Sequence, residues 1–224
     1  MKKMNLGLFS VWASAVLLLL SSCKKEYNNY TFTDTFTSNC PVPADEKYYL
    51  PITTGTYWIY EENLVDGTGN PIDQYSTDST VVTGDTILNN RSFQIIRTYA
   101  LQGSSVIPGT YSTSYFRDSS GFDLTPSGTY FNQSDFTTVF HFIDNYGSYE
   151  SQLFRISNLF SVPAGLFSAI DHQNKFTAND PNYPYGTRIM HDLYADSVGL
   201  LLKTGFFYSN PNKIERRLMR YHIE

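Results

Sequence analysis

The chain contains few charged residues, and this shortage limits the classes of ligand that it could bind. Only 17% of its 224 residues are Asp, Glu, Lys or Arg, below the quarter or so that is usual in globular proteins. The formal net charge is −5. This modest acidity argues against a nucleic-acid ligand, which requires clustered Lys and Arg, and against a polybasic patch for anionic lipid.

Sequence signatures of catalytic and metal sites are also missing. The four histidines, His141, His172, His191 and His222, form no H-E-x-x-H motif and no paired spacing with cysteine, so no metal site is predicted. No G-x-S-x-G elbow marks a nucleophilic serine. The carboxylates are scattered, whereas a glycosidase needs two that face each other across a cleft. We predict no catalytic residue, no metal and no cofactor, with a hydrolase as the less favoured alternative.

The longest apolar run lies at the N-terminus. Lys2 and Lys3 precede an apolar stretch from Leu6 to Leu20, too short for a comfortable membrane span of roughly 20 residues. This order of charges and apolar residues is typical of a signal peptide. The stretch ends in Leu20-Ser21-Ser22-Cys23, which resembles the lipobox of bacterial lipoproteins. No second apolar run is long enough to cross a bilayer.

The lipobox resemblance implies cleavage before Cys23 and acylation of this cysteine. Several acyl chains, at about 0.8 kcal/mol per buried CH2, anchor a protein without a transmembrane helix. The alternatives are an ordinary signal peptide and an uncleaved anchor helix, but the run does not end in an A-x-A-like site. We predict a signal peptide at 1–22, a flexible tether at 23–45 and a β domain at 46–224.

Residue 24 bears on the location of the protein. In the Gram-negative lipoproteins that this N-terminus resembles, Asp after the cysteine often retains the protein in the inner membrane. Lys24 stands there instead, so we expect a lipid anchor in the outer membrane, on the periplasmic face or the cell surface. Cys40 is left over, either as an inert or free thiol or bonded to another chain.

Short strand patterns account for most of the mature chain. Tyr (18) and Phe (16) are abundant, and aromatic and β-branched residues suit a pleated, half-buried surface. We predict a mainly β fold: a single antiparallel β domain (half-barrel, barrel or sandwich) with at most one or two short helices.

Residues 151–160 could hold a helix, because Leu153, Ile156 and Phe160 have helical spacing. Asn89-Asn90 predicts a hairpin turn. The expected strands are 57–62, 78–83, 92–99, 110–117, 121–124, 136–143, 149–156, 166–176, 187–194, 199–208 and 214–223.

Four motifs together resemble a group of uncharacterised Gram-negative envelope lipoproteins. They are Tyr49-Leu50-Pro51 with Gly55-Thr56-Tyr57-Trp58-Ile59-Tyr60, Gly84-Asp85-Thr86-Ile87-Leu88-Asn89, Val162-Pro163-Ala164-Gly165-Leu166-Phe167, and Ser197-Val198-Gly199-Leu200-Leu201. The resemblance implies a LolA-like half-barrel, a curved sheet that cups an apolar ligand. It implies no activity, and the glycines and prolines of the motifs already have a structural explanation in turns and close approaches.

The aromatic residues are the remaining hint of a ligand. Exposed rings on a sheet stack on sugars or line a greasy pocket. Trp58 and Tyr60 share one face of their strand, and Phe140 and Phe142 share one face of theirs. The alternative is an ordinary aromatic core. We predict a non-catalytic binding module for an apolar or glycan ligand, with a structural or accessory role beside an envelope partner protein as the alternative.

Overall fold

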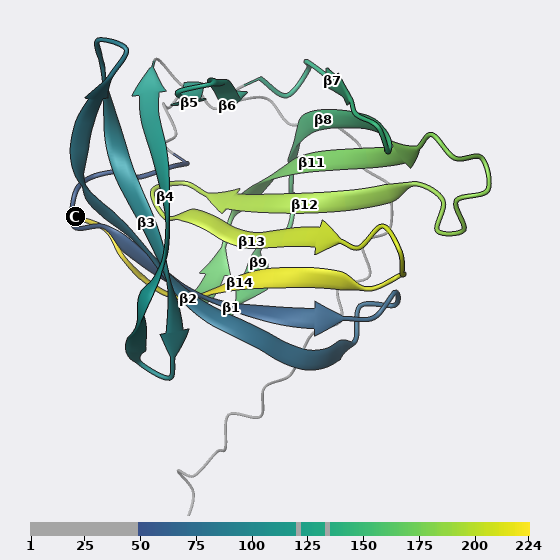
Figure 1. Cartoon of the computed structure of the whole chain (residues 1–224), viewed down its shortest axis with the longest axis horizontal. Coiled ribbons are helices and arrows are strands. Elements are labelled where there is room, and N and C mark those ends of the chain that lie inside the picture. The colour runs from purple at the N-terminus through teal and green to yellow at the C-terminus, as the bar shows by residue number, and fades with distance from the viewer. Residues whose placement is uncertain (1–48, 120–121, 133–134) are drawn as a thin grey trace, which may run out of the picture. The chain divides into compact units, whose positions relative to one another are not determined.

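The computed structural model describes residues 49–119, 122–132 and 135–224, which form strands, turns and bends (Figure 1). The predicted signal peptide, the tether, Cys23 and Cys40 lie outside these residues. Within the described part of the chain, no helix is long and apolar enough to cross a membrane. The predicted mainly β, antiparallel fold is confirmed.

The strands follow one another along the chain with short connections. In order they are β1 (Tyr57–Val65), β2 (Pro71–Leu88), β3 (Arg91–Gln102), β4 (Ser105–Ser119), β5 (Phe122–Thr125), β6 (Gly128–Asn132), β7 (Phe140–Ile143), β8 (Gly147–Arg155), β9 (Phe160–Val162), β10 (Gly165–Phe167), β11 (Ala169–Ala178), β12 (Arg188–Ala195), β13 (Gly199–Phe206) and β14 (Lys213–His222).

One large antiparallel sheet contains twelve of these strands. Its order is β6-β5-β4-β3-β2-β1-β14-β13-β12-β11-β8-β7, and β9 and β10 form a separate hairpin. The two edge strands, β6 and β7, are consecutive in the chain and only residues 133–139 join them. Such a connection spans at most roughly 25–30 Å. The sheet therefore curls until its two edges lie within reach of this short connection.

Curvature is also visible in the contacts of two side chains of β1. Figure 1 shows β3 and β4 running steeply across the direction of β11 to β13. Trp58 donates from Nε1 to the carbonyl of Val198 at 2.6 Å, and the Tyr60 hydroxyl donates to the carbonyl of Leu200 at 3.1 Å. Both bonds cross β14, although two strand spacings in a flat sheet measure about 9.5 Å. This face of the sheet is therefore concave.

The largest core cluster lies around these two rings. It combines residues of the central strands with the β9–β10 hairpin, whose Ala164 N–H donates to the carbonyl of Leu218 at 3.1 Å. Gly199 has φ +102°, and a Cβ there would lie 3.1 Å from Trp58 Nε1, so a glycine is required where the indole crosses. The buried members are Ile52, Trp58, Tyr60, Val82, Ile96, Phe160, Val162, Ala169, Leu193, Ala195, Leu201, Leu202 and Leu218.

Local turn chemistry follows the sequence closely. Asn89 and Asn90 have φ values of 51° and 60° and close the β2–β3 hairpin in the left-handed conformation that Asn tolerates. Val162 and Gly165 flank the Pro163-Ala164 turn of the β9–β10 hairpin and pair with each other. Both turn predictions are confirmed.

The helix that we considered at 151–160 is absent. Residues up to Arg155 belong to β8, which pairs with β7 on one side and β11 on the other, whereas Phe160 begins β9. The helical spacing of Leu153, Ile156 and Phe160 was therefore misleading, because these side chains serve different elements. Long-range strand pairing overrides a weak local pattern here.

Gly147 is the glycine that packing constrains most. A Cβ there would lie 2.3 Å from the carbonyl oxygen of Thr177 and 2.4 Å from the ring of Phe176. We expect Gly147→Ala to lower the free energy of unfolding by about 3 kcal/mol, because backbone and a buried ring cannot both move aside. Urea unfolding followed by tryptophan fluorescence measures this change.

Gly205→Ala is the matched control. No atom lies within 4 Å of a Cβ at this position, so its effect on unfolding stays within about 1 kcal/mol. Equal stabilities of the two variants would contradict the packing argument.

Candidate functional site

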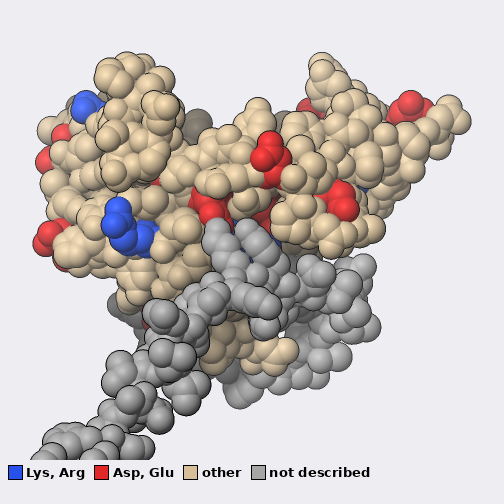
Figure 2. All heavy atoms as spheres, turned by 90° about the horizontal axis from the view of Figure 1, so that it is seen from below, with Lys and Arg blue, Asp and Glu red and all other residues tan. Residues whose placement is uncertain are grey.

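One face of the molecule offers little charge for recognition. Figure 2 shows one face on which isolated acidic and basic side chains lie in a largely uncharged surface. Among the described residues, no group of three or more His, Cys, Asp or Glu side chains could hold a metal ion. Three features with chemical or binding potential remain: two buried polar clusters and an exposed aromatic surface.

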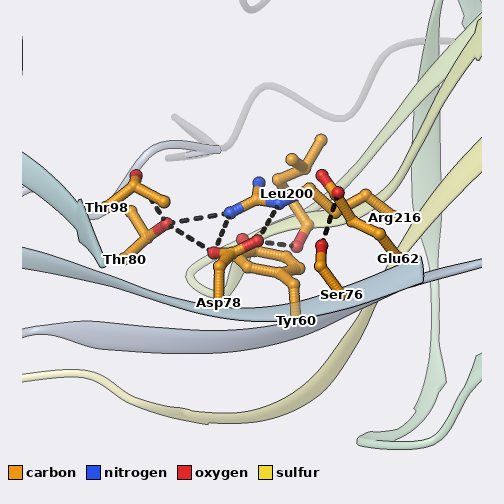
Figure 3. A network of polar contacts seen from close by, with 8 residues as sticks. All are labelled: Tyr60, Glu62, Ser76, Asp78, Thr80, Thr98, Leu200 and Arg216. Atoms are coloured by element: carbon orange, nitrogen blue, oxygen red, sulfur yellow. Dashed lines mark hydrogen bonds and ion pairs between the residues drawn. The ribbon is translucent and has the colours of Figure 1, made fainter. Parts of the chain in front are cut away.

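The first cluster centres on Arg216 on the concave face (Figure 3). Arg216 donates to both carboxylate oxygens of Asp78 at 2.7 and 2.5 Å and to the Thr80 hydroxyl at 2.9 Å. Its guanidinium lies 3.7 Å from the centre of the Tyr60 ring. Because Arg216 belongs to β14 and Asp78 to β2, the ion pair crosses β1 and joins three strands.

Electrostatics keep this cluster charged in spite of its burial. Burial alone would lower the pKa of Arg216, but the hydrogen bond to Asp78, with Tyr60 and Glu62 nearby, raises this pKa above its ordinary value. Both carboxylate oxygens of Asp78 accept hydrogen bonds from Arg216, and Arg216 also donates to Thr80. The cluster holds the sheet together and has no group available for proton transfer in the contacts described.

The second cluster lies on β11 to β13. His191 Nδ1 lies 2.8 Å from Asp171 Oδ2, which also accepts from Gln173 at 2.9 Å. A carboxylate that orients an imidazole is also part of hydrolase sites. The Thr204 hydroxyl, however, accepts the main-chain N–H of His191 at 2.7 Å, so this contact does not set up a nucleophile against the ring.

Burial shifts the pKa values of His172 and Asp192, which lie in the same region. Burial lowers the pKa of His172, against the opposing charges of Asp192 and Asp171. Burial also raises the pKa of Asp192, against the opposing charge of Lys203, whose Nζ lies 3.3 Å from Asp192 Oδ2. His172 and Asp192 stand opposite each other in the β11–β12 register. Burial therefore moves the pKa of each group in the direction that disfavours its charged form.

The third feature is a row of three rings across three strands, which an arginine on a fourth strand continues. In register, Phe142 of β7 pairs with Tyr149 of β8, Tyr149 with Phe176 of β11, and Phe176 with Arg188 of β12. Ring centroids are 5.8 Å apart for Phe142 and Tyr149 and 5.0 Å apart for Tyr149 and Phe176. Cross-strand aromatic pairs at such distances are mutually stabilising.

The outer part of this row faces solvent. Tyr208 contacts both Phe176 and Tyr146, at 6.1 and 5.5 Å between centroids. Four of these rings are substantially exposed: Phe142 by 63%, Tyr146 by 62%, Phe140 by 50% and Tyr208 by 39%. We call the exposed rings of Phe140, Phe142, Tyr146 and Tyr208, together with the partly buried ring of Tyr149, the aromatic surface. The fully buried Phe176 packs against Tyr149 and Tyr208 of this surface.

The aromatic surface borders an open sheet edge. Among the strands of the described residues, β7 pairs with β8 alone and ends the sheet. The N–H of Asp144 donates to the carbonyl of Gly147 at 3.0 Å. By antiparallel alternation, the N–H and C=O groups of Phe140 and Phe142 then point to β8, and those of His141 and Ile143 point outward.

The four sequence candidates for ligand binding separate into two pairs. Trp58 and Tyr60 are only 3% and 2% exposed, and their polar atoms bond main-chain carbonyls. They are core residues in this structure and present no stacking surface. Phe140 and Phe142 are exposed and form the edge of the aromatic surface.

Sequence reasoning missed the rest of the aromatic surface. The signal was present in part, since a hairpin closed by Asp144-Asn145-Tyr146-Gly147 places Phe142 opposite Tyr149. The contacts with Phe176 and Tyr208 depend on pairings between distant segments, which no local pattern indicates.

Comparisons with known proteins identify no family. No family model matches the chain, and no curated protein matches it. It is similar to "a putative lipoprotein" from Parabacteroides distasonis, at 14% identity and a TM-score of 0.41, over 80% of this chain and 100% of that one. It is also similar to "a putative exported protein with YmcC-like fold" from Bacteroides fragilis, at 12% identity and a TM-score of 0.43, over 79% and 99%. Likenesses at this level carry no functional argument, and the LolA-like relation stays a prediction.

The Arg216 cluster leads to a stability prediction. Asp78→Ala leaves a buried guanidinium without its carboxylate, which we expect to cost about 3–5 kcal/mol of unfolding free energy. Glu150→Ala is the control, because its partner Lys175 and Glu150 itself are exposed and such pairs contribute about 1 kcal/mol or less. Urea unfolding of both variants measures the difference, and equal losses would contradict a structural role for the buried pair.

Proposed function

We propose that this chain is an outer-membrane lipoprotein, anchored through lipid on Cys23, whose β domain is a non-catalytic docking module for an envelope partner. The observation that carries the proposal is the aromatic surface on an open edge strand. Exposed rings that touch one another are unusual for an isolated soluble domain, because apolar surface of this kind is normally buried.

The properties of β7 support docking. Natural edge strands are usually protected by short length, lysine, proline, inward charges or bulges, and β7, at four residues, is short. The four residues of β7 include no Lys or Pro, and the β7–β8 register has no shift. All four side chains are exposed. An extended segment of a partner can therefore add to this edge through main-chain hydrogen bonds while its side chains pack on Phe140 and Phe142.

The length of the tether is compatible with docking to a partner at a distance from the membrane. Residues 24–48 separate the lipidated cysteine from the described domain, and a fully extended chain of this length spans up to roughly 80 Å. A domain joined to a lipid anchor by a segment of this length would reach partners up to that distance from the membrane.

A second candidate function is binding of an apolar or glycan ligand. The Tyr146–Tyr208 pair favours it, because two exposed rings with hydroxyls at their rims resemble a sugar-stacking platform. Intact-mass measurement of the natively purified protein separates the two functions. A discrete added mass favours the ligand, and a clean mass favours docking.

The anchor is tested by removing the thiol. In a bacterium fed labelled palmitate, we expect the wild-type chain to carry label and to fractionate with the outer membrane. Cys23→Ser should lose both the label and the membrane association, whereas Cys40→Ser keeps both. Labelled Cys23→Ser protein would show that the lipid is attached elsewhere.

Docking is tested by photo-cross-linking in living cells. A photoreactive residue in place of Ile143 should give a discrete cross-linked product, and Phe142→Ser should reduce that product at least tenfold, because the partner loses its apolar contact. Ile87, at the distant β2–β3 hairpin, is 73% exposed, as is Ile143, so the same probe at Ile87 serves as control. Identical products from both positions, or no effect of Phe142→Ser, would argue against a docking edge.

A further inference from the structure

We propose that one end of the sheet carries a carbohydrate-binding site for a soluble, uncharged glycan chain. The site consists of Tyr146, Tyr183, Tyr185 and Tyr208, which we call the tyrosine platform. The inference goes beyond the docking role of β7, and it selects the glycan from the two ligand classes considered above. Three observations support it: the arrangement of the rings, the bonds that hold them, and the composition of the connections from which they come.

Four rings from three connections meet in the tyrosine platform. Tyr146 lies in the β7–β8 connection, Tyr183 and Tyr185 lie in the β11–β12 connection, and Tyr208 lies in the β13–β14 connection. Figure 1 shows the β11–β12 and β13–β14 connections at the same end of the sheet. The ring centroid of Tyr208 lies 4.8 Å from that of Tyr183 and 5.5 Å from that of Tyr146. The centroid of Tyr185 lies 5.4 Å from that of Tyr183, so the four rings form one continuous group.

The two most exposed rings of the platform are turned relative to each other. Tyr146 is 62% exposed and Tyr208 is 39% exposed, and their planes make an angle of 56°. The C–H face of a sugar ring packs on the apolar face of an aromatic ring, while the sugar hydroxyls stay in water or bond polar groups nearby. One flat sugar cannot lie on two rings at this angle. A chain of linked sugars, whose successive rings are turned relative to one another, can contact both.

Hydrogen bonds hold the β13–β14 connection against the β11–β12 connection. Arg188 is only 6% exposed, and its guanidinium donates to three consecutive carbonyls, those of residues 210–212, at 3.0 to 3.3 Å. The hydroxyl of Tyr185 donates to the carbonyl of Ser209 at 3.0 Å. These bonds fix the main chain on the C-terminal side of Tyr208, so the position of this ring is set by the fold.

The β7–β8 connection is tied to the same end of the sheet. The N–H of Asn179 donates to the carbonyl of Tyr146 at 2.9 Å, and the N–H of Tyr146 donates to Oδ1 of Asp144 at 2.8 Å. All three connections are therefore held in place by the protein itself. A site that is already arranged loses little conformational freedom when a ligand binds, which leaves more of the contact energy for affinity.

The composition of the three connections suits an uncharged sugar chain. Residues 144–146, 179–187 and 207–212 contain four tyrosines and five asparagines, but no Lys, Arg, Leu, Ile, Val or Met. Without a cation, these connections do not attract an anionic polymer, and without aliphatic side chains they offer little to an acyl chain. Amide side chains both donate and accept hydrogen bonds, as sugar hydroxyls do. Three of the asparagines are exposed beside the rings: Asn145, Asn179 and Asn182.

Affinity electrophoresis of the purified chain in detergent tests the site. In native gels that contain soluble starch, mixed-linkage β-glucan or galactomannan, we expect at least one of these polysaccharides to retard the wild type. Tyr146→Ala and Tyr208→Ala should each weaken the affinity measured from this retardation at least fivefold, because each removes a ring face on which a sugar packs. Tyr111→Ala is the matched control and should bind as the wild type does. The ring of Tyr111 is 57% exposed and lies 5.8 Å from that of Tyr99, but it belongs to β4.

Several outcomes overturn the inference. Migration that none of the three polysaccharides alters means that the platform is not a site for an uncharged glycan, and an equal loss of affinity in Tyr111→Ala means that any exposed tyrosine serves as well. Stronger retardation by polygalacturonate means that charge, and not ring stacking, drives binding. Self-association of the wild type that Tyr208→Ala abolishes means that a second copy of the chain covers the rings.

The docking role of β7 is measured separately. Phe142→Ser, which we expect to reduce the cross-linked product at residue 143, should leave polysaccharide binding within twofold of the wild type. A loss as large as that of Tyr208→Ala would place the glycan on the β7 edge and overturn the tyrosine platform. If no polysaccharide binds but the probe at residue 143 still captures a partner, this inference fails and docking stands. If polysaccharide binds but that probe captures nothing, docking fails and the glycan site stands.

Discussion

The buried charge of Arg216 is the constraint on which the middle of the sheet depends. A guanidinium removed from water is costly unless its partners are fixed in place, and here Asp78, Thr80 and the Tyr60 ring supply them. These groups come from β14, β2 and β1, so the charge is satisfied only when the strands pair in this register and bend toward each other. Curvature, register and the ion pair are therefore mutually dependent.

That curvature determines which aromatic residues are buried and which are exposed. Along the concave middle, the ring of Trp58 crosses β14 and reaches a carbonyl of the segment before β13, so it is enclosed by the sheet itself. Toward β7 the sheet ends, and Phe142 has a neighbour on one side only. Trp58 is therefore buried and Phe142 is exposed, because Trp58 lies where the sheet bends and Phe142 lies at its edge.

The sequence predicted what local chemistry determines. The Asn89-Asn90 turn, the Pro163-Ala164 turn and the alternating strands were all recoverable, because φ preferences and period-2 patterns act over a few residues. The Asp78–Arg216 pair was not, since its members are 138 positions apart and only the strand order brings them together. For the same reason the sequence ranked Trp58 with Phe142 as ligand candidates, although burial separates them. Prediction from sequence therefore failed where long-range pairing decides.

An incompletely closed sheet explains why the edge matters. A barrel removes both edges by pairing its first and last strands, but here β6 and β7 end the sheet without pairing with each other. The connection 133–139 keeps the ends of these two strands within roughly 25–30 Å of each other. A partner strand that added to β7, as we propose, would pack its side chains on Phe140 and Phe142. An extended segment with apolar side chains on that face is therefore the partner that the proposed docking requires.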